Sequence, residues 1–185
     1  MNIFYLSENS LDCAQWAVDK HCIKMILEAA QLLSTAHRVL DGSELTVQVK
    51  NKTGKFRKKK VWILTEPRNS RLYNATHVNH PCAKWARESA ENYLWLWRYL
   101  YFHCKEYTHR YGKVHKVERD GLLAELVFIP KNIKDRPFST PPSAMDAKYI
   151  ISNDPIVNYR NYYKHGKAHL HSWKNREVPE WIKEN

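Results

Sequence analysis

Glycine is scarce in this sequence, with five residues in 185, and none belongs to a glycine-rich phosphate loop or a Gly-x-Ser-x-Gly element. P-loop and dinucleotide-binding enzymes, and serine hydrolases with a nucleophile elbow, therefore lack their motif here. The chain also has no internal repeat and no low-complexity linker. Its length and its apolar fraction of 43% predict one compact domain over residues 1–185.

Long apolar runs and paired cysteines are absent as well. The start, MNIFYLSENS, lacks the basic region and apolar length of a signal peptide, and no run reaches membrane-spanning length. The four cysteines, Cys13, Cys22, Cys82 and Cys104, form no Cys-x-x-Cys pair and lie in apolar helical patterns. We therefore expect reduced, buried thiols in a cytoplasmic protein with no membrane partner.

Acidic residues are outnumbered, because 19 Asp and Glu stand against 30 Lys and Arg, for a net charge of +11. Such a surplus favours a polyanionic partner, nucleic acid first and an anionic membrane second. A merely soluble basic protein is the alternative, and the distribution of the charge has to decide. No feature of the composition implies a protein partner, so we expect a monomer.

Two long patterns with helical spacing dominate the chain. The first covers about residues 10–39, with Ser7 or Ser10 as N-cap, and the second covers residues 81–111 and begins at a proline. Shorter helices are expected at RDGLLAELVF and at the start of the C-terminal segment, residues 155–185. These patterns predict a mainly α, compact single-domain fold with one small β insertion.

That insertion is expected at about residues 45–65, where alternating valines flank Asn-Lys-Thr-Gly-Lys in the manner of a β-hairpin. Between Leu45 and Thr65 there are seven basic residues and no acidic one. A solvated loop is the plain interpretation of such a run, but aromatic residues within it favour contact with phosphates. The residues predicted to bind nucleic acid here are Lys55, Arg57, Lys58, Lys59 and Lys60.

The C-terminal segment alternates rings with cations, as base stacking and phosphate contact require. About half of the following residues are expected to face nucleic acid: Tyr159, Arg160, Tyr162, Tyr163, Lys164 and Lys167. A packed terminal helix would also use some of these tyrosines. Two of the three histidines nearby have the i,i+4 spacing of a metal-binding pair, but no third ligand lies at a convincing spacing. Neither a metal nor another cofactor is therefore predicted.

A polar stripe lies in DKHCIKMILE, residues 19–28, within the first helical pattern. Spacings of three, four and three place four side chains on one helix face, namely His21, Lys24, Glu28 and Gln31. Ile23, Ile26 and Ala30 are expected on the opposite, core face. The stripe is either an ordinary solvent-facing surface with an i,i+4 ion pair or a functional site.

The spacing Asp-x-His, with a glutamate seven residues after the histidine, resembles the pyrimidine-dimer DNA glycosylases, the small bacteriophage-type excision nucleases. The matching residues are Asp19, His21 and Glu28. The helix exit STAHRVLDG, the Gly112–Lys113 pair after an aromatic helix, and the tail YRNYYKHGKA are similar to that family in place and character. The resemblance is remote, and the insertions at residues 45–65 and 114–150 have no counterpart in it.

The resemblance implies a helical glycosylase fold, in the host cytoplasm if the protein is phage-encoded. It also implies excision of pyrimidine photoproducts with associated abasic-site lyase activity. In that family an N-terminal α-amine attacks C1′ of a flipped nucleotide, forms a Schiff base and breaks the strand by β-elimination. Such an amine, with a pKa of about 7.7–8.0, keeps a neutral fraction near neutral pH.

The catalytic residues carried over are the chain start, Met1 or Asn2, with Glu28 handling protons and His21 orienting sugar or phosphate. Asn2 disfavours removal of the initiator methionine, so the amine is expected on Met1. Lys24 and Gln31, on the same helix face, are expected to bind substrate.

Two histidines precede the second long helix in THVNHP, and a basic side chain follows two turns on. Helix N-termini bind phosphates, so His77, His80 and Arg87 are expected to line the same pocket as His21. A core or capping histidine is the alternative at each position. Two other functions stay open for the chain: an enzyme that modifies or excises a modified pyrimidine base or nucleotide in phage DNA, and a non-enzymatic DNA-binding module.

Overall fold

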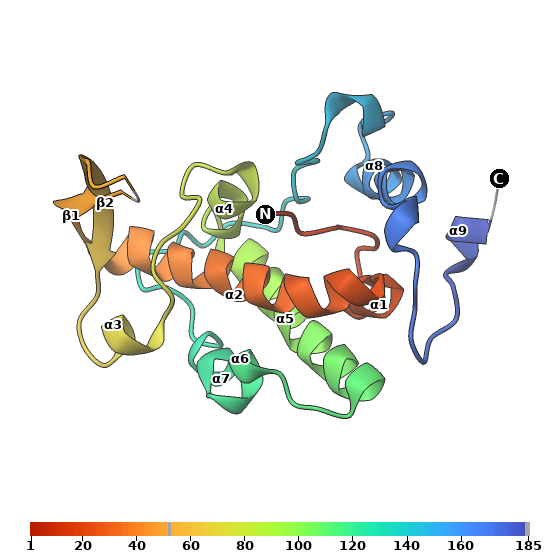
Figure 1. Ribbon diagram of the computed structural model, residues 1–185, viewed down its shortest axis with the longest axis horizontal. Coiled ribbons are helices and arrows are strands. Elements are labelled where there is room, and N and C mark those ends of the chain that lie inside the picture. Colours follow the sequence, from red (N-terminus) through yellow and green to blue (C-terminus); the bar gives the residue numbers. More distant parts are fainter. Residues whose placement is uncertain (52, 184–185) are drawn as a thin grey trace.

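A computed structural model describes residues 1–51 and 53–183, so residue 52 of the expected hairpin and residues 184–185 of the C-terminal segment lie outside it. The fold is mainly α, as predicted, with one two-stranded sheet. Its two long helices are α2, Asp19–Asp41, and α5, Ala90–Tyr111, which pack against each other across the centre of the molecule (Figure 1).

The first helical pattern is not one helix, contrary to the prediction. It divides into α1, Ser10–Trp16, and α2, because Ala17 and Val18 adopt extended backbone conformations between them. The N-cap of α1 is Asn9, whose side chain accepts from the Leu11 N–H at 2.9 Å. Most apolar residues of both helices face the core, so the pattern indicated their burial and missed the break.

The second pattern also divides. Helix α4, Pro81–Ala86, ends before a break at residues 87–89, and Ser89 then caps α5 by accepting from the Asn92 N–H at 3.1 Å. Gly112 ends α5 with a φ of 63°, the left-handed conformation that glycine adopts without strain. The predicted start and end of the pattern are therefore confirmed, and only its continuity is wrong.

The hairpin prediction is confirmed. Strand β1, Ser43–Lys50, pairs antiparallel with β2, Phe56–Ile63, and Ser43 lies opposite Ile63. The hairpin projects from the C-terminal end of α2, and α8 and α9 lie near the other end of that helix (Figure 1). Gly42 joins α2 to β1 where a Cβ would lie 2.5 Å from the Arg38 carbonyl oxygen, so only glycine fits.

The remaining helices are short: α3, Arg68–Arg71; α6, Lys116–Arg119; α7, Leu122–Glu125; α8, Pro155–Asn161; α9, Glu180–Lys183; and single turns at Ala147–Tyr149, Tyr162–Gly166 and Ala168–Leu170. Helices α7 and α8 lie where short helices were predicted. None of the helices among residues 1–51 and 53–183 is long and apolar enough to cross a membrane.

The core forms around the N-terminal segment as well as the long helices. Residues 3–6 are buried, and they run above α2 between α4 and α8 (Figure 1). All four cysteines are free and buried, as predicted. Ile23 is a correction, because 43% of its surface is exposed. The core thus holds the first residues of the chain directly against the polar stripe of α2.

Candidate active site

Glu28 is the residue of the polar stripe that meets the start of the chain. Its carboxylate accepts from the Asn2 backbone N–H at 3.1 Å and lies 3.3 Å from the Lys24 ammonium. The Glu28 side chain is 12% exposed and that of Lys24 is 67% exposed. A partly buried carboxylate that has one backbone donor and one exposed cation keeps lone pairs for a further ligand.

The start of the chain is held in place by aromatic packing. Phe4 has a φ of 40°, in the left-handed region, where a non-glycine side chain is strained. Its ring stacks on His21 with centroids 4.1 Å apart and lies parallel to Tyr162 at 6.2 Å. Because Phe4 is anchored on both sides, residues 1 and 2 have a defined position beside Glu28.

His21 supports this arrangement from inside the core. Its Nδ1 lies 2.7 Å from the Tyr163 hydroxyl, and the residue is 5% exposed. Burial, and to a smaller extent the charges of Lys167 and Lys24, lower the pKa of His21 to about 3. A neutral, buried ring under Phe4 positions the N-terminal segment. The expectation that His21 itself orients a sugar or phosphate does not agree with this placement.

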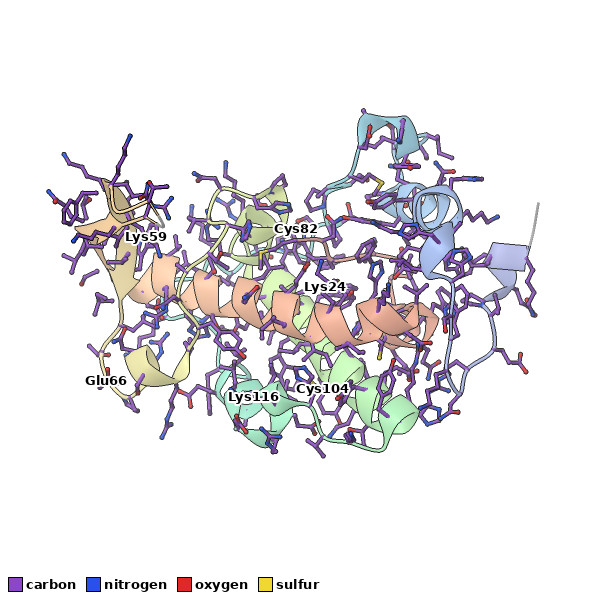
Figure 2. All side chains as sticks on the ribbon, viewed as in Figure 1. Lys24, Lys59, Glu66, Cys82, Cys104 and Lys116 are labelled. Carbon is purple, nitrogen blue, oxygen red and sulfur yellow. The ribbon has the colours of Figure 1, made fainter. Side chains whose placement is uncertain are left out.

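The α-amine of Met1 lies on the α4 side of the same site. Burial lowers the pKa of His80 and the Met1 amine lowers it further, whereas Glu28 opposes this shift. At Cys82 burial raises the thiol pKa to about 11, with the amine and Glu28 again acting in opposite directions. The amine and the carboxylate therefore both lie within electrostatic reach of His80 and Cys82. In Figure 2 Cys82, on α4, is labelled above α2, and Lys24 is labelled on α2 itself.

The side chains predicted around α4 are only partly brought together. His80 is a helix cap, because its Nδ1 accepts from the Cys82 N–H at 3.2 Å. His77 is exposed, with a φ of 49°, and its ring bonds to the neighbouring Thr76 hydroxyl at 2.8 Å. Arg87 donates back to the Ala83 carbonyl at 2.8 Å. The capping alternative is thus correct for His80, which still borders the site.

The remaining stripe residue, Gln31, is half-buried one turn beyond Glu28 on α2. Sequence reasoning missed two neighbours of the site, Phe4 and Cys82. The apolar start NIFY signalled that Phe4 would be buried, but no pattern in the sequence indicated its strained backbone or its ring partners.

Two tyrosines of the C-terminal segment were wrongly predicted to be available to a ligand. Tyr159 and Tyr163 are completely buried, and the Tyr159 hydroxyl donates to the Pro142 carbonyl at 2.9 Å. Arg160 donates to the Leu6 carbonyl at 3.0 Å, and its guanidinium lies over the rings of Trp16 and Trp181. These residues attach the C-terminal segment to the core, as the packed-helix alternative supposed.

Tyr162 and Lys167 occupy a different place. Both are half-buried, and the Lys167 ammonium lies 4.8 Å from the centroid of the Tyr162 ring, which itself faces Phe4. Lys164 is also half-buried on the same turn. Since Lys167 and Lys24 both act on the pKa of His21, their ammonium groups approach the site from opposite ends of the sequence.

Asp19, the first residue of the Asp-x-His spacing, has a structural role. Its carboxylate accepts from Arg110 at 3.0 Å, from the Ser172 hydroxyl at 2.5 Å and from the Lys174 N–H at 2.9 Å. Burial raises its pKa, but these hydrogen bonds outweigh burial and hold the pKa below its ordinary value. Asp19 therefore connects the start of α2 to α5 and to the C-terminal segment.

The hairpin presents cations to solvent. Lys55, Arg57, Lys58, Lys59 and Lys60 are all exposed, and Lys60 pairs with Glu44 at 2.7 Å. The other side chains of that group extend from a two-stranded ribbon without an acidic neighbour on β2. The ribbon therefore presents a row of exposed positive charges.

We expect the hairpin cations to control the salt dependence of duplex DNA binding. Replacing Lys58 and Lys59 with alanine should reduce the slope of log affinity against log salt by about 0.9 for each lost phosphate contact. The matched control replaces the exposed Lys113 and Lys116, which removes the same charge elsewhere. Fluorescence anisotropy at several salt concentrations measures both slopes, and equal slopes for the two variants would contradict a specific role for the hairpin.

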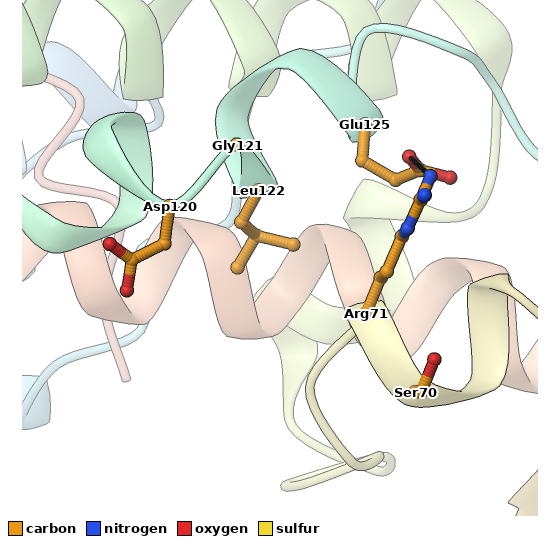
Figure 3. Close-up of a pocket in the computed structure, with 6 residues that line it drawn as sticks. All are labelled: Ser70, Arg71, Asp120, Gly121, Leu122 and Glu125. Atoms are coloured by element: carbon orange, nitrogen blue, oxygen red, sulfur yellow. Dashed lines mark hydrogen bonds and ion pairs between the residues drawn. The ribbon is translucent and has the colours of Figure 1, made fainter.

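A separate hollow of about 490 Å³ lies between α3 and α6–α7 (Figure 3). Arg71 and Glu125 form an ion pair at 3.1 Å across it, and Asp120 borders it. It lies on the opposite side of α2 from the N-terminal segment (Figure 1). No sequence-predicted site residue lines it, so the hollow and the Glu28 site are separate features.

Comparison of the chain with protein-family models, with curated proteins and with solved structures finds no match to any of them. Across the described part of the chain no group of three or more metal-ligating side chains could hold a metal ion. The function therefore has to be inferred from the geometry at Glu28.

Proposed function

We propose that this chain is a monomeric DNA glycosylase of the pyrimidine-dimer type, with associated abasic-site lyase activity. The α-amine of Met1 is its nucleophile and Glu28 is its proton-handling group. The observation that carries the proposal is the 3.1 Å hydrogen bond from the Asn2 N–H to the Glu28 carboxylate, which brings the chain start to the only acid of the α2 stripe.

The residues present suit each step of this chemistry. The neutral amine attacks C1′, the C1′–N bond breaks, and its electron pair leaves with the base, which takes up a proton. Loss of one amine proton and opening of the sugar ring, in which the C1′–O4′ bond breaks and O4′ takes up a proton, then leave a protonated Schiff base. Removal of a C2′ proton then expels the 3′ phosphate, and water releases the enzyme. In this proposal Glu28 accepts the amine proton and stabilises the cationic sugar.

The cations around the site suit a phosphodiester substrate. Lys24, 67% exposed, pairs with Glu28, and the half-buried Lys167 lies over the Tyr162 ring. Their charge would neutralise adjacent phosphates, and Tyr162 offers a ring face beside Phe4. The hairpin would bind the backbone farther along the duplex. Pyrimidine photoproducts are the lesion class that the sequence resemblance implies.

Borohydride trapping on an abasic duplex tests this proposal. We expect a covalent adduct between protein and DNA, and peptide mass spectrometry should place the adduct at Met1. Adding Gly-Ser before Met1 moves the amine away from Glu28 and should abolish the adduct, while the same two residues added after the C-terminus should not. Absence of any adduct, or an adduct on a lysine, would contradict the amine as nucleophile.

A further inference from the structure

The solvent-facing side of α2 carries an apolar pair next to the candidate site. Ile23 and Leu27 are each 43% exposed, more than any other aliphatic residue of the helix. They are one turn apart, so their side chains form a single ridge. Leu27 lies three residues after Lys24, which pairs with Glu28 at 3.3 Å, so the ridge neighbours the site across that lysine.

The surroundings of this ridge are cationic. Lys20 and Lys24, both exposed, flank Ile23 on the same helix. Single exposed aliphatic residues are common on protein surfaces and need no explanation. An adjacent aliphatic pair between lysines, beside a carboxylate that holds the chain start, is a more specific arrangement.

Charge complementarity decides which partner fits this surface. A second copy of the chain would bring Lys20 and Lys24 against their own equivalents in a symmetric interface, where like charges repel. A nucleic acid supplies phosphates for the lysines and an apolar interior, the stacked bases, for the ridge. Aliphatic side chains that enter a base step from such a basic surface unstack it and bend the duplex.

We propose that Ile23 and Leu27 act as an apolar wedge that enters the base stack of duplex DNA and holds open the gap left by the nucleotide that moves to Glu28. This inference rests on the proposed function, because it names the duplex as the form of the substrate. Unstacking costs free energy, and burial of the two side chains between bases offsets it. A single strand has no stack to open and gains nothing from the wedge.

The test compares Ile23→Ser/Leu27→Ser with Val114→Ser/Val127→Ser, a control pair that is 48% and 39% exposed away from the site. The probe is a duplex with 2-aminopurine beside an abasic-site analogue. We expect the wild type and the control to raise its fluorescence, and the wedge variant to lose the increase. The wedge variant should bind this duplex about tenfold more weakly, because two apolar contacts are lost. Binding to the single strand should change less than twofold.

Equal duplex binding and fluorescence in the two variants would overturn the wedge. So would a change of oligomeric state in sedimentation by the wedge variant alone, since the ridge would then be a contact between copies. Failure of the wedge is distinguishable from failure of the proposed chemistry. Normal trapping by a wedge variant that also keeps the fluorescence increase overturns only the wedge. A wild type that raises the fluorescence but forms no adduct, with the increase lost in the wedge variant, keeps the wedge and overturns the lyase.

Discussion

Glu28→Gln lowers single-turnover cleavage of an abasic duplex by about 10²–10⁴-fold, the range typical of a lost general acid–base group. In the wild type the Glu28 carboxylate accepts from the Asn2 N–H at 3.1 Å. The amide has the same size and its oxygen can still accept this hydrogen bond, so the chain start should stay in place. It cannot accept the amine proton or stabilise a cationic sugar. Duplex affinity should therefore change less than about twofold, because the loss of cleavage is confined to the chemical step.

A matched control for this variant is Glu118→Gln. Glu118 also pairs with a lysine, Lys105, and its side chain is 21% exposed, but it lies on α6 away from the N-terminal segment. Cleavage by this control should equal that of the wild type. If Glu28→Gln retained full cleavage, Glu28 would be only a structural partner of Asn2. If neither variant changed anything and no cleavage occurred at all, the chain would be a binding module.

Arg110→Met lowers the free energy of unfolding by about 3–5 kcal/mol, because removing one partner of a buried ion pair leaves the other charge uncompensated. Arg110 is completely buried, and it bonds to Glu106 at 2.7 Å and to Asp19 at 3.0 Å. It also donates to the carbonyls of Gln15 and Ala17, which lie at the end of α1 and in the break between α1 and α2. Urea unfolding followed by circular dichroism measures the effect.

The control for stability is Arg119→Met, whose exposed pair with Asp120 should contribute less than about 0.5 kcal/mol. Arg176 also contacts Glu106, at 2.8 Å, and so compensates part of its charge after Arg110 is lost. A loss in Arg110→Met no larger than that in Arg119→Met would mean that the network contributes no net stability. Because Asp19 joins the same network, Arg110→Met should also loosen the start of α2.

Local signals in the sequence predicted much of the fold. Helix ends followed from Gly112 and from the Asp154 and Pro155 start of α8, and the hairpin followed from alternating valines around a turn. These features depend on neighbouring residues, so a linear pattern contains them. The breaks at Ala17–Val18 and at residues 87–89 depend on contacts with distant elements, such as Arg110 on the carbonyl of Ala17, and no local pattern indicated them.

The candidate site divides in the same way. Spacing alone placed Lys24 and Glu28 on one helix face, because helical geometry is set by the backbone. Only the tertiary structure decided that His21 turns inward under Phe4, that Tyr159 and Tyr163 belong to the core, and that Ile23 faces solvent. Those outcomes depend on which elements cover each face. The sequence by itself determined which side chains share a helix face, the net charge and the hairpin. Packing determined which of those faces are buried and that the chain start meets Glu28.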